Sequence, residues 1–407
     1  MDLLLKPSVL KQSCHISISG SKSETNRLLL LKALYPEISI ENISDSDDAD
    51  VMKHALASGN DTIDVHHAGT AMRFLTAYFA TQPNREIILT GSERMKQRPI
   101  KILVEALRSL GAKIEYVANV GYPPLKIKGV NIQHNEVSVN ANVSSQYITA
   151  LLLIGASFKN GLTIKLEGDI TSQPYINMTT DLLQQVGITV KKGGGHITVS
   201  TAKVLKPVTI TVESDWSSAS YYYSLVALAK ESTEVSLSFY KKNSLQGDSA
   251  LIDIYRQLGV ETVFEGNTIT LIKTNSIPEA INLDLNNTPD IAQTVAVTCF
   301  GLGVECTLTG LHTLKIKETD RLEALRNELS KLGAEVAVTE DSLKLLPASD
   351  IKPDVAIETY NDHRMAMAFA PLALKTSIII KNAEVVSKSY PSFWKDFNEA
   401  GIVSKEL

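Results

Sequence analysis

The sequence has little cysteine and no long apolar run. Only three of its 407 residues are Cys (Cys14, Cys299 and Cys306), and none has a CxxC partner or a His at metal-ligand spacing. This pattern disfavours structural zinc and a disulfide framework and fits a reducing cytosol, so we expect a cytoplasmic protein. No apolar run approaches the roughly 18 residues of a transmembrane helix. Residues 1–7 also lack the features of a signal peptide, so we expect no membrane partner.

Positive charge is also in short supply. The chain has 40 Lys and Arg against 45 Asp and Glu, a formal net charge of −5, which argues against nucleic acid as the main partner. An acidic protein can bind anions only where it concentrates Lys and Arg locally. The length exceeds what one hydrophobic core usually covers, so two domains are expected.

What the sequence does contain is an internal repeat. An amphipathic helix that ends in Gly, followed in most copies by two short strands, recurs at Gly59, Gly111, Gly187, Gly259, Gly333 and Gly401. The spacings are 52, 76, 72, 74 and 68 residues, which indicates six copies of one unit. Each Gly is expected to cap its helix in the left-handed conformation.

Each unit also contains an earlier helix that is apolar on nearly all sides. These helices are expected to begin near Ser21, Gly69, Val143, Trp216, Pro289 and Asp362. A helix without a polar face should be buried, whereas the amphipathic helix of each unit should lie outside it. The sequence therefore predicts an α/β protein of six strand–helix–strand–helix–strand–strand (βαβαββ) units, with buried helices and sheets outside, grouped as two domains of three.

The N-terminal residues have no obvious local partner. Residues 1–19 contain an alternating strand around Cys14–Ile18, which we place with the second half of the chain. The predicted domains are residues 21–213 and residues 1–20 plus 214–407. The chain would then cross twice between domains, and the six buried helices could point their N-termini at one interdomain cleft.

Polar residues gather at these six helix starts. The first is Gly20-Ser21-Lys22-Ser23-Glu24-Thr25-Asn26-Arg27, and the others also carry Lys, Arg, Gln or hydroxyl side chains. Helix N-termini and cationic side chains both favour anions. The pattern predicts a site for multiply charged anions, with the carboxylates Asp290 and Glu318 available for proton transfer.

Six motifs together resemble the 5-enolpyruvylshikimate-3-phosphate synthase family. They are Gly-Ser-Lys-Ser-x-x-Asn-Arg (20–27), Ala-Gly-Thr-Ala-Met-Arg (68–73), Lys-x-Arg-Pro (96–99), Ser-Ser-Gln (144–146), Lys-Glu-Thr-Asp-Arg-Leu (317–322) and Asn-Asp-His-Arg-Met-Ala (361–366). The resemblance implies a two-domain inside-out α/β barrel. It also implies transfer of the enolpyruvyl group of phosphoenolpyruvate to the 5-hydroxyl of shikimate 3-phosphate, with release of phosphate, by addition and elimination. The family needs no cofactor, serves aromatic amino-acid biosynthesis through the shikimate pathway, and is expected to be monomeric.

The resemblance also implies roles for individual residues. Asp290 resembles the base for the 5-hydroxyl, and Glu318, assisted by Lys22, resembles the group that protonates the methylene carbon. The positions implied for shikimate 3-phosphate are Lys22, Ser23, Arg27, Ser144, Ser145, Gln146, Ser172, Tyr175, Asp290, Thr313 and Lys317. Those implied for phosphoenolpyruvate are Lys22, Gly69, Arg98, Gln146, Arg321, Arg364 and Lys388. His67 and Thr313 depart from the pattern, because the family usually has Asn or Asp at the first position and Asn at the second.

Two other functions stay open on the sequence. The paralogous transferase that acts on UDP-N-acetylglucosamine usually has a Lys-Asn pair and a reactive Cys on a loop; here Ser23 follows Lys22, and Gly91–Ile100 contains no Cys. A non-catalytic anion-binding relative is the second alternative, and the presence of both Asp290 and Glu318 argues against it.

Overall fold

A computed structural model describes residues 1–142, 144–168, 172–230, 232–348 and 350–407. The chain forms two compact units, which are Gly20–Val212 and the combination of Met1–Ser19 with Glu213–Leu407. Val143, one of the expected helix starts, lies outside the described residues. No helix in the described ranges is both long enough and apolar enough to cross a membrane.

The unit Gly20–Val212 contains six α-helices and ten strands in its described part. Its helices are α1 (Lys22–Leu34), α2 (Asp47–Ala57), α3 (Gly69–Ala80), α4 (Lys101–Ser109), α5 (Ser145–Gly155) and α6 (Gln173–Gln185), with one 3-10 turn η1 (Met95–Gln97). Its strands are β3 (Ile38–Glu41), β4 (Thr62–Asp64), β5 (Glu86–Thr90), β6 (Lys113–Tyr116), β7 (Leu125–Lys128), β8 (Glu136–Asn140), β9 (Leu162–Glu167), β10 (Val190–Gly193), β11 (His196–Val199) and β12 (Val208–Thr211).

The other unit contains both described ends of the chain. Its α-helices are α7 (Trp216–Leu228), α8 (Leu251–Gln257), α9 (Ala292–Leu302), α10 (Arg321–Lys331), α11 (His363–Phe369) and α12 (Phe393–Ala400). Its 3-10 segments are η2 (Gly247–Ala250), η3 (Pro289–Ile291), η4 (His312–Ile316), η5 (Ala370–Leu374) and η6 (Ala383–Lys388). Its strands are β1 (Leu3–Leu5), β2 (Ser13–Ile16), β13 (Glu234–Ser238), β14 (Val260–Glu265), β15 (Thr268–Lys273), β16 (Ala280–Asp284), β17 (Glu305–Thr309), β18 (Val336–Val338), β19 (Leu343–Leu345), β20 (Val355–Ile357), β21 (Ile378–Ile380) and β22 (Ser404–Glu406).

Five four-stranded sheets among the described residues share one topology. The orders are β4-β5-β7-β6, β8-β9-β11-β10, β2-β13-β15-β14, β16-β17-β19-β18 and β20-β21-β1-β22. In each sheet the first two strands are parallel and the next pairings are antiparallel. Parallel neighbours require a crossover, which one apolar helix provides in four of these sheets, while the connection from β2 to β13 includes the whole of Gly20–Val212 before α7. The predicted repeat and α/β fold class are confirmed.

The first repeat is shorter than the others. Its sheet has only the parallel pair β3 and β12. Helix α2 ends at Ala57 and β4 of the next repeat begins at Thr62, so no room remains for two closing strands. This accounts for the 52-residue spacing between Gly59 and Gly111.

Strands from distant parts of the sequence complete the sheets. Strand β2 pairs in parallel with β13, where Cys14 lies opposite Val235. Strand β12 pairs with β3, where Ile210 lies opposite Ile40. Strand β1 lies between β21 and β22. The unit that includes Glu213–Leu407 therefore needs residues 1–19 for two of its sheets.

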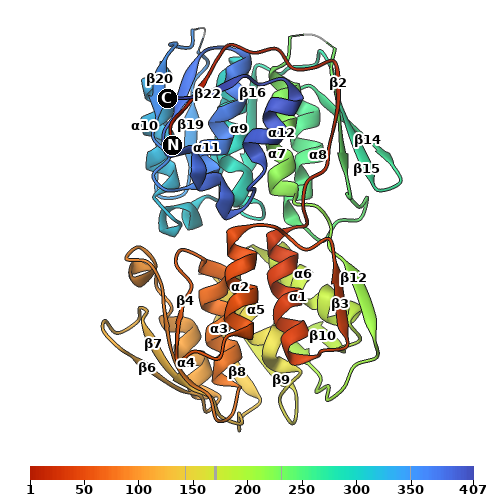
Figure 1. Ribbon diagram of the computed structural model, residues 1–407, viewed down its shortest axis with the longest axis vertical. Coiled ribbons are helices and arrows are strands. Elements are labelled where there is room, and N and C mark those ends of the chain that lie inside the picture. The colour runs from red at the N-terminus through yellow and green to blue at the C-terminus, as the bar shows by residue number, and fades with distance from the viewer. Residues whose placement is uncertain (143, 169–171, 231, 349) are drawn as a thin grey trace. The chain divides into compact units, whose positions relative to one another are not determined.

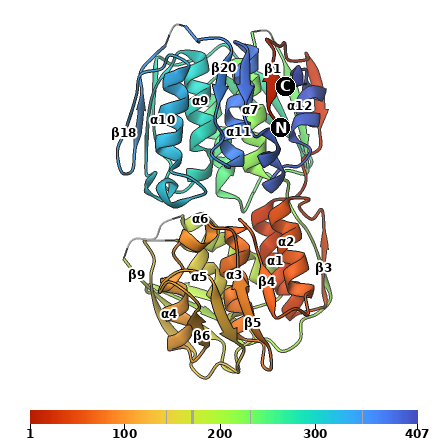
Figure 2. The ribbon, with the colours of Figure 1, turned by 60° about the vertical axis from the view of Figure 1, so that its left-hand side comes forward.

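The apolar helices form the interior of each unit. Helices α1, α3 and α5 contact one another, and α9 contacts both α7 and α11. In α3, α5 and α7, 10 of 12, 10 of 11 and 12 of 13 residues are buried, against 4 of 9 in the amphipathic α4. Figures 1 and 2 show helices in the middle of each unit and strands at its margins. This matches the prediction for helices that lack a polar face.

Two local predictions differ from the structure. Five of the six repeat glycines have positive φ, but α2 is capped by Ser58 in an extended conformation, so the predicted role of Gly59 as a left-handed cap is wrong. No hairpin follows α2, and the chain runs on directly to β4. The last apolar helix is also broken, because α11 gives way to the 3-10 segment η5 around Pro371, whose ring removes a helical hydrogen-bond donor.

Candidate active site

Arg321 is the centre of a buried ionic network in the unit that includes Glu213–Leu407. It is the first residue of α10, and its side chain is 2% exposed. Its Nε lies 2.7 Å from Asp362 Oδ2, Nη1 lies 3.1 Å from Asp290 Oδ1, and Nη2 lies 3.1 Å from Glu318 Oε2. Burial alone would lower the pKa of Arg321, but these three carboxylates raise it above its ordinary value. The guanidinium is therefore permanently charged.

Asp290 receives positive charge from three side chains. Besides Arg321, Arg364 Nη2 lies 3.1 Å from its Oδ2 and Lys317 Nζ lies 3.5 Å from its Oδ1. Pro289 begins the 3-10 turn η3 that presents Asp290, a position where a missing N–H costs no hydrogen bond. Three cationic side chains therefore lie against this carboxylate.

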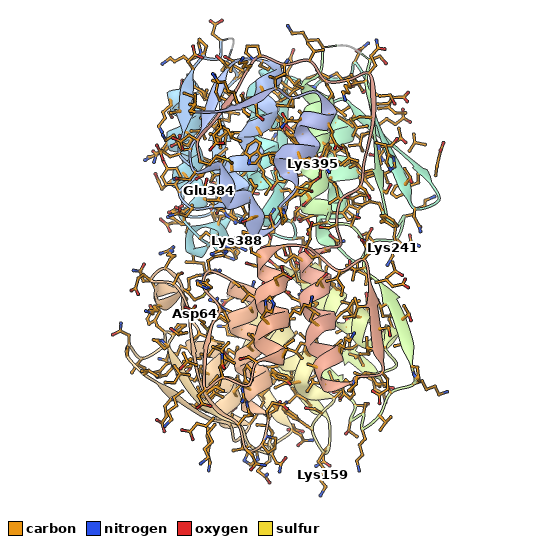
Figure 3. The ribbon with its side chains drawn as sticks, in the orientation of Figure 1. Asp64, Lys159, Lys241, Glu384, Lys388 and Lys395 are labelled. Atoms are coloured by element: carbon orange, nitrogen blue, oxygen red, sulfur yellow. The ribbon has the colours of Figure 1, made fainter. Side chains whose placement is uncertain are left out.

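Glu318 is held by two cations. Its Oε2 pairs with Arg321, and its Oε1 is in close contact with Lys388 Nζ. Lys388, labelled in Figure 3, is the last residue of η6, and its side chain is only 5% exposed. Glu384 on the same turn is instead at the surface, where it pairs with the amino group of Met1. Segment η6 therefore carries a buried cation, Lys388, and an exposed anion, Glu384.

Asp362 joins the start of α11 to Arg321. Its Oδ1 accepts the backbone N–H of Arg364 at 2.9 Å, so it caps the helix, while Oδ2 accepts from Arg321. Asp362 is fully buried, and the ring of His363 is nearly so. His363 Nδ1 lies 3.7 Å from Asp362 Oδ1, beyond hydrogen-bond distance.

In the unit Gly20–Val212, Arg27 is buried and donates hydrogen bonds to neutral groups, while the carboxylate of Glu24 is close enough to interact with its charge. Its Nε donates to Thr179 Oγ1 at 2.9 Å, Nη1 to Ser23 O at 2.7 Å, and Nη2 to Tyr175 O at 3.3 Å. Its guanidinium carbon also lies 5.6 Å from the ring centre of Phe74. Burial lowers the pKa of Arg27 to about 10, so it stays charged at neutral pH. The residue ties α1 to α6.

Lys22 is paired with a carboxylate that the sequence did not single out. Its Nζ lies 3.5 Å from Oδ2 of Asp48, in the first turn of α2, and the two side chains are 16% and 3% exposed. Ser21 occupies the N-cap position of α1, but its side chain makes no capping hydrogen bond. The Ser21 hydroxyl therefore does not occupy the backbone N–H groups at the start of α1.

Gly69 and Arg98 are in direct contact. A Cβ at Gly69 would lie 2.5 Å from Arg98 Nη1 and 3.0 Å from Cζ, so a larger residue would displace this guanidinium from its place. Arg73, one turn along α3, donates to Gly69 O and to Pro99 O, each at 3.1 Å. It fastens the segment that carries Arg98 to the start of α3.

The hydroxyl and amide positions lie at two further helix starts. Ser144 caps α5 by accepting from the N–H of Gln146, and Gln146 Nε2 lies 3.4 Å from Thr70 Oγ1. Ser172 precedes α6 in the left-handed conformation. Ser145 and Ser172 are buried, and Tyr175 is half-buried. These predicted residues therefore lie at the starts of α5 and α6.

The two departures from the family pattern lie in different environments. Thr313 lies in η4, and its Oγ1 is buried with no hydrogen-bond partner among the described residues. His67 is exposed in the turn that precedes α3. Asp48, Ser217, Asp248 and Thr179 take part in these networks but were not predicted, because each looks in sequence like an ordinary turn or helix residue.

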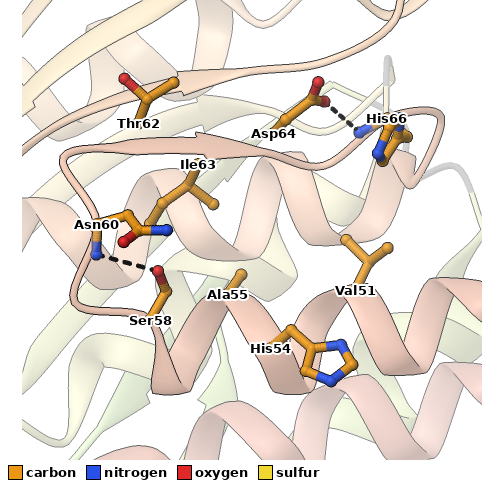
Figure 4. Close-up of a pocket in the computed structure, with 9 residues that line it drawn as sticks. All are labelled: Val51, His54, Ala55, Ser58, Asn60, Thr62, Ile63, Asp64 and His66. Carbon is orange, nitrogen blue, oxygen red and sulfur yellow. Dashed lines mark hydrogen bonds between the residues drawn. The ribbon is translucent and has the colours of Figure 1, made fainter.

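A separate pocket lies between α2 and β4. Its volume is about 290 Å³, and it is lined by Val51, His54, Ala55, Ser58, Asn60, Thr62, Ile63, Asp64 and His66. Figure 4 shows Asp64 turned to the backbone of His66, whose N–H donates to it at 2.7 Å. None of the predicted site residues lines this pocket.

The chain matches known proteins over nearly its whole length. Residues 51–397 match the family model described as EPSP synthase (3-phosphoshikimate 1-carboxyvinyltransferase). A 3-phosphoshikimate 1-carboxyvinyltransferase of Bacteroides fragilis (strain YCH46) is 45% identical over 403 residues, covering 98% of this chain and 97% of its own. The enzyme of that name from Histophilus somni (strain 2336) is 36% identical, covering 94% and 95%.

Solved structures show the same fold. EPSP synthase from Acinetobacter baumannii superposes with a TM-score of 0.79 at 22% identity, covering 99% of both chains. The enolpyruvyl transferase NikO from Streptomyces tendae gives 0.77 at 14% identity, covering 100% of this chain and 98% of its own. These two matches speak to the fold alone. On the family model and the curated relatives, the chain belongs to the EPSP synthase (3-phosphoshikimate 1-carboxyvinyltransferase) family.

Proposed function

We propose that this chain is a 3-phosphoshikimate 1-carboxyvinyltransferase that acts in the shikimate pathway of aromatic amino-acid biosynthesis. It transfers the enolpyruvyl group of phosphoenolpyruvate to the 5-hydroxyl of shikimate 3-phosphate and releases phosphate. The observation that carries the proposal is the Arg321 network, in which four cations fix two carboxylates suited to proton transfer. A site that only bound anions would be weakened by Asp290 and Glu318.

The two units supply different ligand groups. In Gly20–Val212 we propose that shikimate 3-phosphate contacts Lys22, Ser23, Arg27, Ser144, Ser145, Gln146, Ser172 and Tyr175, and that phosphoenolpyruvate contacts Lys22, Gly69, Arg98 and Gln146. In the other unit we propose Asp290, Thr313 and Lys317 for shikimate 3-phosphate, and Arg321, Arg364 and Lys388 for phosphoenolpyruvate. Each substrate carries a phosphate and a carboxylate, and charge-assisted hydrogen bonds from Arg and Lys suit both groups.

The chemistry proceeds in two steps. In the addition, Asp290 takes the proton of the 5-hydroxyl as the hydroxyl oxygen bonds to C2 of phosphoenolpyruvate, and Glu318, which starts this step protonated, delivers its proton to C3 with the help of Lys22. In the elimination, C3 returns a proton to Glu318, the C2–O bond to phosphate breaks, the enol double bond forms again, and Asp290 gives the hydroxyl proton to the departing phosphate. Protons and charge balance, and no further reactant is needed. Asp290 and Glu318 are held on the same guanidinium, which fixes both groups relative to each other.

The test is phosphate release from phosphoenolpyruvate by the purified protein. We expect release only when shikimate 3-phosphate is present, with formation of the enolpyruvyl product confirmed by mass spectrometry. Release with UDP-N-acetylglucosamine instead would assign the chain to the paralogous reaction. Absence of turnover with either acceptor, from folded protein that binds the substrates, would favour a non-catalytic relative. Light scattering at about 44.4 kDa would support our further expectation of a monomer.

A further inference from the structure

The side chain of Asp248 is linked to the Arg321 network through Ser217 and Arg364, and it has no role in the reaction described above. It belongs to η2, and it is 4% exposed. Its Oδ2 accepts a hydrogen bond from Ser217 Oγ, and that hydroxyl in turn accepts from Arg364 Nη2 at 3.3 Å. Arg364 pairs on its other side with Asp290. A continuous chain of contacts therefore runs from Asp248 through Ser217 and Arg364 to Asp290.

The segment before Asp248 is anchored firmly to the start of α7. Gln246 Oε1 accepts the backbone N–H of Trp216 at 3.0 Å, and Gln246 Nε2 donates to Ser214 O at 2.9 Å. The buried Glu213 accepts from Ser244 Oγ at 2.6 Å and from the indole N–H of Trp216 at 2.8 Å. These bonds fix the position of Asp248 relative to Ser217.

We propose that Asp248 is a positioning residue for Arg364, and that the charge on its carboxyl group sets how strongly Arg364 holds phosphoenolpyruvate. The proposal rests on the proposed function, because it takes Arg364 as a ligand of that substrate. An ionised Asp248 offers a second negative charge to Arg364 and so competes with an incoming anion. A neutral Asp248 still accepts the Ser217 hydrogen bond but leaves the positive charge of Arg364 for the substrate.

The surroundings of Asp248 bring the change between its neutral and ionised forms into the physiological pH range. Burial, and then the negative charge of Asp290, raise its pKa to about 7, against the lowering effects of Arg364 and the Ser217 hydrogen bond; Asp215 at the start of α7 adds a smaller raising effect. Its Oδ1 is buried with no hydrogen-bond partner among the described residues, which also disfavours the ionised form. Binding an anion at Arg364 should therefore favour protonation of Asp248, and affinity should fall as pH rises through neutrality.

The experiment compares the pH dependence of KM for phosphoenolpyruvate in four proteins. In the wild-type protein, at saturating shikimate 3-phosphate, we expect KM to rise roughly tenfold from pH 6 to 8.5, the effect of about one pKa unit of coupling. In Asp248→Asn, KM should stay near the low-pH wild-type value, apart from the titration of the substrates themselves, with kcat within about threefold. In Ser217→Ala the hydroxyl link is lost, so KM should rise at every pH. Asp253→Asn, which removes an exposed carboxylate on α8, should behave as wild type.

Binding measurements separate this proposal from the proposed function. Titration calorimetry in two buffers of different ionisation enthalpy reports the protons taken up when phosphoenolpyruvate binds, whether or not turnover occurs. At pH 7.5 the wild-type protein should take up a larger fraction of a proton than Asp248→Asn. Equal proton uptake, or parallel KM profiles in correctly folded variants, would overturn the role of Asp248 and leave the proposed reaction standing. If the wild-type protein takes up more protons than Asp248→Asn but shows no turnover, only the proposed reaction is overturned.

Discussion

The two units hold their buried arginines in opposite ways. Arg27 is surrounded by hydroxyl and carbonyl oxygens, and burial lowers its pKa to about 10. Arg321 is surrounded by three carboxylates, which raise its pKa. Their places in the repeat also differ, because Arg321 is the first residue of the amphipathic helix α10 whereas Arg27 is the sixth residue of the apolar helix α1. The partners of each guanidinium therefore decide what it can do.

The difference in partners implies a division of labour. A guanidinium held by neutral groups keeps its net positive charge available to an anion. A guanidinium shared among carboxylates offers little net charge but holds those carboxylates in fixed positions. We infer that the unit Gly20–Val212 mainly binds, and that the Arg321 network mainly carries out proton transfer. The following changes test this contrast, from the largest expected effect to the smallest.

Replacement Asp290→Asn should have the largest effect. It removes the proposed base but keeps the size of the side chain, so we expect kcat to fall by about 10²–10⁴ with KM values changed only severalfold. Steady-state phosphate release measures both parameters. Asp284→Asn, at an exposed carboxylate that closes a local turn, is the matched control and should retain activity. Near-normal kcat in Asp290→Asn would show that Asp290 does not carry out the proton transfer.

Replacement Asp362→Ala should destabilise the unit that contains Arg321. It removes the fully buried partner of the guanidinium and the cap of α11, and loss of one member of a buried ion pair typically costs about 3–5 kcal/mol. Calorimetric unfolding measures the loss. Asp362→Asn keeps an oxygen for the cap and should lose less. An unchanged unfolding midpoint in Asp362→Ala would show that Glu318 and Asp290 alone satisfy Arg321.

Replacement Asp248→Asn should change how stability depends on pH. The pKa of Asp248 is about 7 in the folded protein and 3.8 in a model peptide, so the wild-type protein loses stability as pH rises between these values, by about 1.4 kcal/mol per pH unit. The variant lacks this titration. We therefore expect its unfolding midpoint to exceed that of the wild type at pH 8 and to approach it near pH 4. A constant difference across this range would contradict the shifted pKa.

Replacement Thr179→Val should have the smallest effect. It removes the hydroxyl that accepts from Arg27 Nε and donates to Tyr175 O, at a cost of roughly 1–3 kcal/mol. Thr180→Val is the matched control, because the neighbouring buried hydroxyl bonds only to the carbonyl of Asn177 among the described contacts. Calorimetry of the two variants isolates the bond to Arg27 together with the contact of Thr179 Oγ1 to Thr149 Oγ1 at 3.2 Å. Equal losses would mean that neutral partners add little to the placement of this arginine.

The sequence predicts the architecture well because the same hydropathy pattern and the same helix-end residues recur in most repeats. Apolar helices, capping glycines such as Gly111, and polar helix starts recur in most copies, so one ambiguous copy is resolved by the others. The prediction for Gly59 is wrong because the first repeat lacks the hairpin that follows the capping glycine in the other repeats. A repeat-based prediction is weakest where a copy is truncated.

The partners of the site residues were harder to predict than the residues themselves. Arg321 and Asp290 stand in recognisable motifs, whereas Asp48 and Asp248 lie in short polar stretches that read as solvated turns. Each gains its role only when a segment distant in sequence packs against it, as η2 does against the start of α7. Hydropathy and spacing carry no information on such pairings, since they depend on tertiary packing.

The placement of β1 between β21 and β22 has a consequence for how the protein is made. Leu4 lies opposite both Ile379 and Lys405, so this sheet closes only after almost the entire chain has left the ribosome. At about 5–20 residues per second, the N-terminal strand waits on the order of 20–80 s for its neighbours. Gly20–Val212 contains all of its own strands and can fold during that interval. Strand β1 is therefore among the last to reach its native place, whereas β2 can pair as soon as β13 has been synthesised. Until its partners arrive, β1 is an exposed apolar segment to which a chaperone can bind.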